Sequence, residues 1–115
     1  MSESIFSKII QRKAPASILF ENDKFIVIAN KDPKAPVHLL IIPKHPYQNL
    51  EEVALTDQDF HAEILILCRQ MAKKMKIADN YQIHINVGKK MQQVQHLHIH
   101  LLGGWKNPEE IKQII

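Results

Sequence analysis

A strict alternation of polar and apolar residues in the last quarter of the chain constrains its fold more than any other feature. From His96 to Leu101 every second residue is aliphatic, and the residues between are histidines. Side chains on a β-strand alternate between its two faces, so this pattern predicts a strand over residues 94–102. His96, His98 and His100 would then share one face, and the aliphatic face would pack on a core. We expect the histidine face to line a cleft.

The remaining hydrophobic patterns predict four more strands and three helices. The strands are expected at 17–20, 25–28, 38–42 and 81–87, and the helices at 4–12, at 57–77 and from 107 onward. Ser2 or Ser4 is the expected cap of the first helix, and Thr56 that of the long helix. With no repeat and no linker, residues 1–115 are predicted to form one domain of the α+β class, built on a five-stranded antiparallel sheet.

Composition excludes several classes of protein. The chain is 45% hydrophobic and 23% charged with a net charge of +3, and its only arginines are Arg12 and Arg69, so nucleic-acid binding is not expected. No apolar run approaches the ~20 residues that span a bilayer, so no membrane partner is expected. One cysteine, Cys68, excludes a disulfide framework and suits a reducing compartment. The first residues, 1–4, carry no secretion signal, and we expect a cytoplasmic protein.

Three interpretations of the histidine row remain open from the residues alone. The row could be a solvated strand face, although lysine, glutamate and threonine are the usual residues there. It could bind a metal, but His96 and His100 would lie ~13 Å apart on a strand, too far to share one ion. A pair of these histidines with a remote third ligand would still be possible. The third interpretation is catalysis, with a histidine as nucleophile or acid–base group.

Three segments resemble the histidine triad (HIT) superfamily. Residues 96–102 are similar to its His-φ-His-φ-His-φ-φ signature, where φ is an apolar residue, and residues 100–104 to its glycine exit. Residues 4–10 resemble the "IFxKII" segment of its nucleotide-binding branch, and residues 35–44 resemble the "APxHxLVIPK" segment. The resemblance covers nearly the whole chain and implies a HIT-like fold.

The resemblance also implies a reaction. The branch consists of hydrolases that act on purine nucleoside 5′-phosphoramidates at the α-phosphate, which makes His98 the expected nucleophile and nucleotidyl-histidine the expected intermediate. His100 would stabilise the phosphate oxygens, while His96 and His38 would form the supporting hydrogen-bond layer. Neutral imidazole attacks without first losing a proton, which suits this role. No cofactor and no metal is expected, and the expected partner is a small purine nucleotide.

The same resemblance implies a set of nucleotide contacts. The expected residues are Asn30, Asn86, Gln93, Val94, Ile5, Phe6, Ile9 and Ile28, although Ile5, Phe6 and Ile9 fit simple core packing equally well. Asn30 stands where the family has a ribose-binding aspartate, and Gln93 where it has a serine or threonine. Ser4 and Ser7 stand where zinc-binding relatives have cysteines, so no structural zinc is expected. His84 lies outside the family pattern and is interpreted as structural.

Two other functions and one assembly state accompany this interpretation. A dinucleoside polyphosphate hydrolase would use the same nucleophile, and a nucleotide-binding regulatory protein would use the same fold with little catalysis. The predicted long helix carries four consecutive apolar residues, 64–67, which is wider than one buried stripe requires. This second apolar face predicts a homodimer with a symmetric interface.

Overall fold

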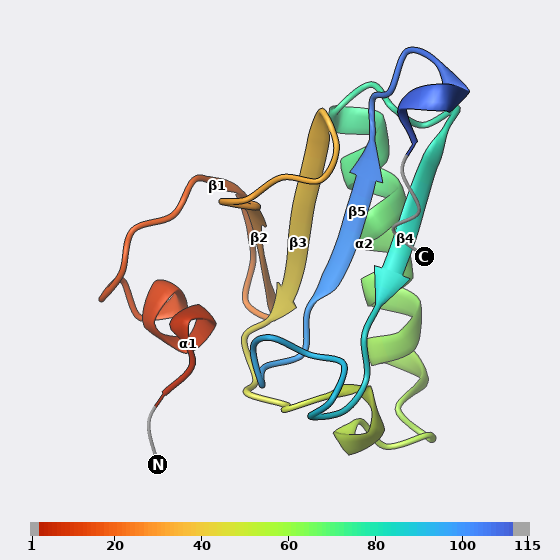
Figure 1. Cartoon of the computed structure of the whole chain (residues 1–115). Coiled ribbons are helices and arrows are strands. Elements are labelled where there is room, and N and C mark those ends of the chain that lie inside the picture. Colours follow the sequence, from red (N-terminus) through yellow and green to blue (C-terminus); the bar gives the residue numbers. More distant parts are fainter. Residues whose placement is uncertain (1–2, 112–115) are drawn as a thin grey trace.

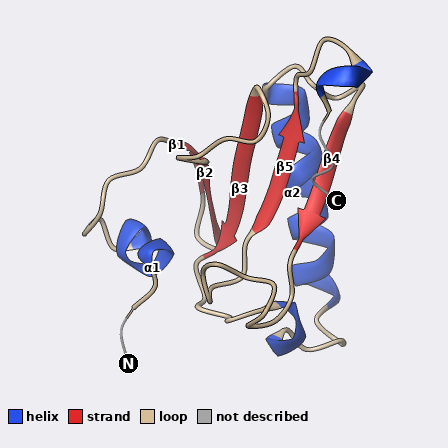
Figure 2. Cartoon of the chain, viewed as in Figure 1, coloured by secondary structure: helices blue, strands red, loops and turns tan. Residues whose placement is uncertain are grey.

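The computed structural model describes residues 3–111, which form one twisted sheet with the long helix on one face (Figures 1 and 2). Residues of the short N-terminal helix pack in a second buried layer with residues of the sheet. In chain order the elements are α1 (Ile5–Ile10), β1 (Ile18–Glu21), β2 (Phe25–Ala29), β3 (Val37–Pro43), the 3-10 helix η1 (Leu50–Glu52), α2 (Gln58–Lys74), β4 (Tyr81–Ile85), β5 (Ile99–Gly103) and the 3-10 helix η2 (Pro108–Glu110). The strand order is β1-β2-β3-β5-β4, and every neighbouring pair is antiparallel. The predicted α+β fold with a five-stranded antiparallel sheet is therefore confirmed.

Strand alternation divides the core into two layers. In β3, Leu39 and Ile41 pack with the buried residues of α2, whereas Leu40 and Ile42 pack with Phe6 and other residues near α1. Because both faces of β2 and β3 are covered, these central strands are continuous apolar runs rather than alternating ones. Packing on both faces thus holds β2 and β3 in place, and β5 pairs directly with β3.

The long helix differs from its prediction at both ends. Its N-cap is Asp57, whose carboxylate accepts from the Phe60 N–H at 3.0 Å, so the predicted cap Thr56 is wrong. The helix ends at Lys74, earlier than predicted, and Lys76 has φ 61°, a left-handed conformation that stops a helix. No helix among residues 3–111 is long and apolar enough to cross a membrane.

The histidine strand is much shorter than predicted. β5 begins at Ile99, so His96 and His98 precede the strand, and the prediction of three evenly spaced histidines on one face is wrong. Continuing the register of β3 with β5 would place Leu97 opposite Pro43. Proline has no N–H to offer the ladder, and the Leu97 N–H donates to the Tyr47 carbonyl at 2.8 Å instead. The chain therefore leaves the sheet before Ile99.

At the N-terminal end of the described chain the predicted cap Ser4 is confirmed, and at the C-terminal end the predicted helix is only a 3-10 turn. Ser4 caps α1 by accepting from the Ser7 N–H at 3.0 Å, whereas Ser2, the alternative cap, lies outside the described residues. The predicted C-terminal helix appears as the single 3-10 turn η2, and its continuation past Ile111 lies outside the described residues. β4 also ends two residues before its predicted end.

Gly103, the last residue of β5, tests this packing. A Cβ there would lie 2.7 Å from the Ile77 Cδ1 and 3.1 Å from the Asn80 carbonyl oxygen. We expect Gly103→Ala to lower the free energy of unfolding by about 1–3 kcal/mol, as overpacking does. Ile77→Val removes the clashing methyl, so the double variant should lose less than the sum of the two single losses in urea unfolding. Additive losses would contradict the contact.

Candidate functional site

Three histidines surround His100 of β5: His38 of β3, His84 of β4 and His98, which precedes β5. In this cluster the ring centroid of His100 lies 5.1 Å from that of His98, 5.1 Å from that of His38 and 5.3 Å from that of His84. His84 is directly opposite His100 in the register of β4 and β5, and His38 lies on the adjacent strand β3. The sheet thus places His38 next to His100 and also brings in His84, which was interpreted from the sequence as structural.

His96 does not join this cluster. Its Nε2 lies 2.9 Å from the Pro43 carbonyl oxygen, and its Nδ1 lies 3.1 Å from the Ser4 Oγ and 3.3 Å from the Ser7 Oγ. A carbonyl can only accept, so Nε2 carries the proton and Nδ1 of the neutral ring is an acceptor. His96 therefore links β3 to α1 beneath the cluster.

One backbone hydrogen bond sets the tautomer of His98. The His98 Nδ1 lies 2.7 Å from the His96 carbonyl oxygen, so Nδ1 carries the proton. In the neutral ring the lone pair is then on Nε2, and no residue among 3–111 hydrogen-bonds to that atom. Every fully buried side-chain nitrogen or oxygen in the described chain has a partner, so this Nε2 is not fully buried. It is an unprotonated imidazole nitrogen that is not fully buried, on a residue that is 8% exposed.

A second backbone bond sets the tautomers of His38 and His100. The Lys34 backbone N–H donates to the His38 Nδ1 at 2.9 Å, which makes Nδ1 an acceptor and places the proton on Nε2. That Nε2 lies 2.9 Å from the His100 Nδ1 and donates to it. The remaining nitrogen of neutral His100, Nε2, then carries a proton. His100 thus has a donor nitrogen on the ring whose centroid lies 5.1 Å from that of His98.

The pKa values of these rings keep them neutral. Burial is the largest cause that lowers the pKa of His38, His96 and His98 below its ordinary value. Burial, as the largest cause, and the neighbouring His98, His38 and His84 together lower the pKa of His100 to about 3. The imidazoles of these four residues, His38, His96, His98 and His100, are therefore neutral at neutral pH, and each keeps both a donor and an acceptor nitrogen.

An apolar wall from α1 stands against the cluster. Phe6, Ile9 and Ile28 are buried in one layer with half-buried Val94 against it, and the Phe6 ring lies edge-on to the His98 ring with centroids 4.9 Å apart. Ile5 is 46% exposed and does not join that layer. Four of the five apolar nucleotide-contact residues expected from sequence are thus brought together.

The expected polar contacts lie at the margin of the cluster. The Asn30 oxygen accepts from the Asp32 N–H at 2.9 Å, and its amide nitrogen lies 3.1 Å from the His38 Nε2; both of these nitrogens are donors in the tautomer set by Lys34, so they make no hydrogen bond. The Asn86 Oδ1 accepts from the His84 Nε2–H at 3.1 Å. Gln93 is exposed. No group of three metal-ligating residues in the described ranges is arranged to hold an ion.

Sequence reasoning missed Gln92, the neighbour of Gln93. It is buried, accepts from the Gly88 N–H at 2.8 Å and donates to the carbonyls of Gln48 and Val94 at 2.9 and 3.1 Å. Gln92 thus holds the loop that leads into the triad. Nothing in a run of three glutamines among four residues distinguishes the buried one from its exposed neighbours.

The lowered histidine pKa values predict an acid-sensitive fold. Below about pH 6.5 the unfolded chain binds protons that the buried rings of the native protein exclude. Stability is therefore complete above about pH 6.5 and falls as the pH drops toward the native values, by up to about 1.4 kcal/mol per pH unit for each proton involved. Urea unfolding between pH 7.5 and 5 measures this slope. His100→Gln should reduce the slope, because it removes a buried ring whose pKa is lowered. A flat profile would contradict the neutral cluster.

Comparisons with known proteins agree with this geometry. The HIT domain model matches residues 11–107. An uncharacterized HIT-like protein of Synechocystis is 39% identical over 103 residues, covering 89% of this chain and 90% of that protein. A HIT family hydrolase from Clostridium thermocellum has a TM-score of 0.87 at 34% identity, covering 100% of this chain and 99% of that one. A histidine triad nucleotide-binding protein from Candida albicans has a TM-score of 0.77 at 31% identity, covering 91% and 84%. The chain belongs to the histidine triad family and has the fold of its solved hydrolase members.

Proposed function

We propose that the protein is a nucleotide hydrolase that cleaves purine nucleoside 5′-phosphoramidates at the α-phosphate through a nucleotidyl-histidine on His98. One observation carries the proposal: the bond from the His98 Nδ1–H to the His96 carbonyl leaves the other ring nitrogen unprotonated and not fully buried. A nucleophilic imidazole needs this arrangement. The similarity to a nucleotide-binding HIT protein supports a nucleotide as the ligand.

The proposed reaction has two displacements. In the first, the His98 Nε2 attacks the α-phosphorus, the P–N bond to the leaving amine breaks, and the amine departs with a proton from solvent. In the second, water attacks the same phosphorus, the bond to Nε2 breaks, the nucleoside monophosphate leaves, and the proton of water returns to solvent. The His100 Nε2–H would donate to a phosphate oxygen as charge develops, and His38 would hold His100 in the tautomer that can donate.

The nucleoside would lie along the wall from α1. Phe6, Ile9, Ile28 and Val94 offer an apolar surface for a purine ring beside His98. Asn30, next to His38, would contact the ribose, while Asn86 and Gln93 would contact the phosphate or ribose. His96 acts indirectly, because its carbonyl orients the His98 ring.

The decisive variant is His98→Ala. We expect turnover of adenosine 5′-phosphoramidate to fall by several orders of magnitude while AMP still binds, since the wall and the polar contacts remain. His61→Ala, which changes a histidine of α2 outside the cluster, should keep its turnover. Stopped assays on AMP and GMP phosphoramidates and on dinucleoside polyphosphates would identify the leaving group. Near-normal turnover by His98→Ala would overturn the mechanism.

The intermediate itself can be tested chemically. Imidazole added to His98→Gly fills the space of the missing ring, so we expect partial rescue of turnover. Because the P–N bond of a nucleotidyl-histidine is labile in acid and survives in alkali, wild-type enzyme quenched in alkaline denaturant should carry a nucleotidyl adduct on the peptide that contains His98, as measured by mass spectrometry. An adduct on another histidine would reassign the nucleophile.

We also propose that the protein is a cytoplasmic homodimer. The single buried cysteine suits a reducing compartment. On α2, Leu65 and Ile66 are 53% and 50% exposed, and the edge strand β4 also presents exposed Ile83 and Ile85. Exposed apolar side chains on an edge strand and an adjacent helix are typical of an interface.

Sedimentation tests the assembly state. We expect a dimer at micromolar concentration, and Leu65→Lys with Ile66→Lys should shift it to monomer by placing charges in the interface. Glu63→Lys introduces a lysine on the same helix without removing an apolar side chain and serves as the control. A wild-type monomer at that concentration would remove the proposal.

A further inference from the structure

We propose that Ser4 and Ser7 form, with His96, a positioning clamp through which the first turn of α1 orients the nucleophile His98. This inference deepens the proposed function and rests on it. The clamp consists of the two serine hydroxyls, the His96 ring and the His96 carbonyl. It makes an N-terminal helix, distant in sequence, part of the catalytic geometry.

The first half of the clamp is the link between the hydroxyls and the ring. The His96 Nε2–H is committed to the Pro43 carbonyl, so Nδ1 needs a donor. The Ser4 Oγ lies 3.1 Å from it and the Ser7 Oγ 3.3 Å. The Ser4 oxygen accepts from the Ser7 N–H, and its one hydrogen can point to this Nδ1 or to the Ser7 Oγ, 3.4 Å away. The single lone pair of Nδ1 takes one hydroxyl hydrogen, and the second hydroxyl lies within reach of the first.

The second half is the link from His96 to His98. The same residue that α1 holds by its ring provides the carbonyl that accepts from the His98 Nδ1–H at 2.7 Å. Phe6, which lies between the two serines in sequence, packs edge-on against both rings, with centroids 6.1 Å from His96 and 4.9 Å from His98. A displacement of the first turn of α1 would therefore move the His98 ring through two contacts, the His96 carbonyl and the Phe6 ring.

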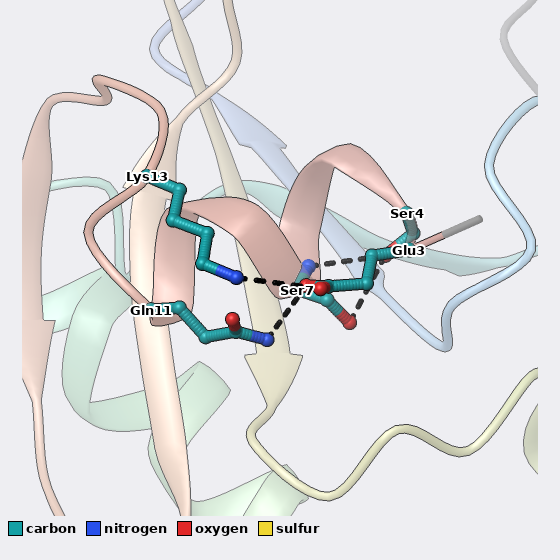
Figure 3. A network of polar contacts seen from close by, with 5 residues as sticks. All are labelled: Glu3, Ser4, Ser7, Gln11 and Lys13. Atoms are coloured by element: carbon teal, nitrogen blue, oxygen red, sulfur yellow. Dashed lines mark hydrogen bonds and ion pairs between the residues drawn. The ribbon is translucent and has the colours of Figure 1, made fainter.

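The first turn of α1 is itself held in place. Glu3 accepts from the Gln11 side chain at 2.7 Å and pairs with Lys13 at 3.5 Å, beside the hydrogen bonds of Ser4 and Ser7 (Figure 3). On the other side of the helix, Phe6 and Ile9 are buried in the layer on the sheet. The hydroxyls therefore approach His96 from a fixed support rather than from a free chain end.

Loss of both hydroxyls would leave an acceptor without a partner. His96 is 2% exposed, so water cannot readily replace the donors, and an unpaired buried acceptor is costly. The ring can escape this cost by turning or by moving its proton to Nδ1, and either change breaks the bond to Pro43. The His96 carbonyl then shifts, and with it the direction of the His98 lone pair.

The test removes the hydroxyls but keeps the helix cap. Ser4→Gly with Ser7→Ala lacks both donors, while glycine is nearly as good an N-cap as serine. The matched control, Ser4→Thr with Ser7→Ala, retains one donor at the cap. On adenosine 5′-phosphoramidate we expect kcat of the first variant to fall about tenfold or more, as misplaced catalytic groups do, with KM within about twofold of wild type. The control should retain most of the wild-type kcat. If the glycine–alanine variant fails to fold, Ser4→Asp with Ser7→Ala replaces it, since aspartate keeps a side-chain cap but supplies no hydroxyl donor, and we expect the same loss of kcat.

A second readout does not depend on turnover. The 15N shifts of the His96 side chain report which nitrogen carries the proton. We expect a single Nε2–H tautomer in the wild type and in the threonine control, and loss of that single form in the glycine–alanine variant. Unchanged kcat, or an unchanged His96 tautomer, in a folded variant that lacks both hydroxyls would overturn the clamp. If the wild type shows no turnover but the 15N shifts respond as expected, the proposed substrate is wrong and the link between the serines and His96 stands.

Discussion

The hydrogen bond from the His98 Nδ1–H to the His96 carbonyl oxygen organises the candidate site. A neutral imidazole has one proton to place between two nitrogens, and a carbonyl partner decides where it goes. With Nδ1 committed, Nε2 keeps its lone pair and needs no general base to become a nucleophile. This bond forms because the chain leaves the sheet before Ile99, which turns the His96 carbonyl toward the next histidine ring instead of toward β3.

The same principle extends to the neighbouring rings. The Lys34 N–H fixes the tautomer of His38, and His38 fixes that of His100. The Pro43 carbonyl does the same for His96. Each ring is thus oriented directly or through one neighbour by backbone groups of strands or their adjoining loops, and burial keeps all four rings neutral. A sheet packed on both faces is a suitable support, because small displacements of these anchors would change which nitrogen is available.

Sequence patterns predicted the parts that depend on periodicity and local chemistry. The continuous apolar runs predicted β2 and β3, and the spacing of apolar residues predicted α2. The predictions were wrong where contacts between residues distant in sequence determine the local structure. The alternation around His96 is that of a strand, but Pro43 on the neighbouring strand cannot continue the ladder. Asp57 and Thr56 are both competent helix caps, and only the path of the loop selects Asp57. The contact of His96 with Ser4 and Ser7 joins residues about ninety positions apart and has no local signal.

The tautomer of His98 tests this account most directly. Two-bond 1H–15N correlation spectra of the protein labelled with 15N-histidine, recorded near pH 7.5, distinguish a protonated from an unprotonated ring nitrogen. The geometry requires His98 to be neutral with its proton on Nδ1, and His100 and His38 to be neutral with their protons on Nε2. Assignment of the His98 signals follows from their disappearance in His98→Ala. A His98 proton on Nε2, or a positively charged His98 at that pH, would contradict the account.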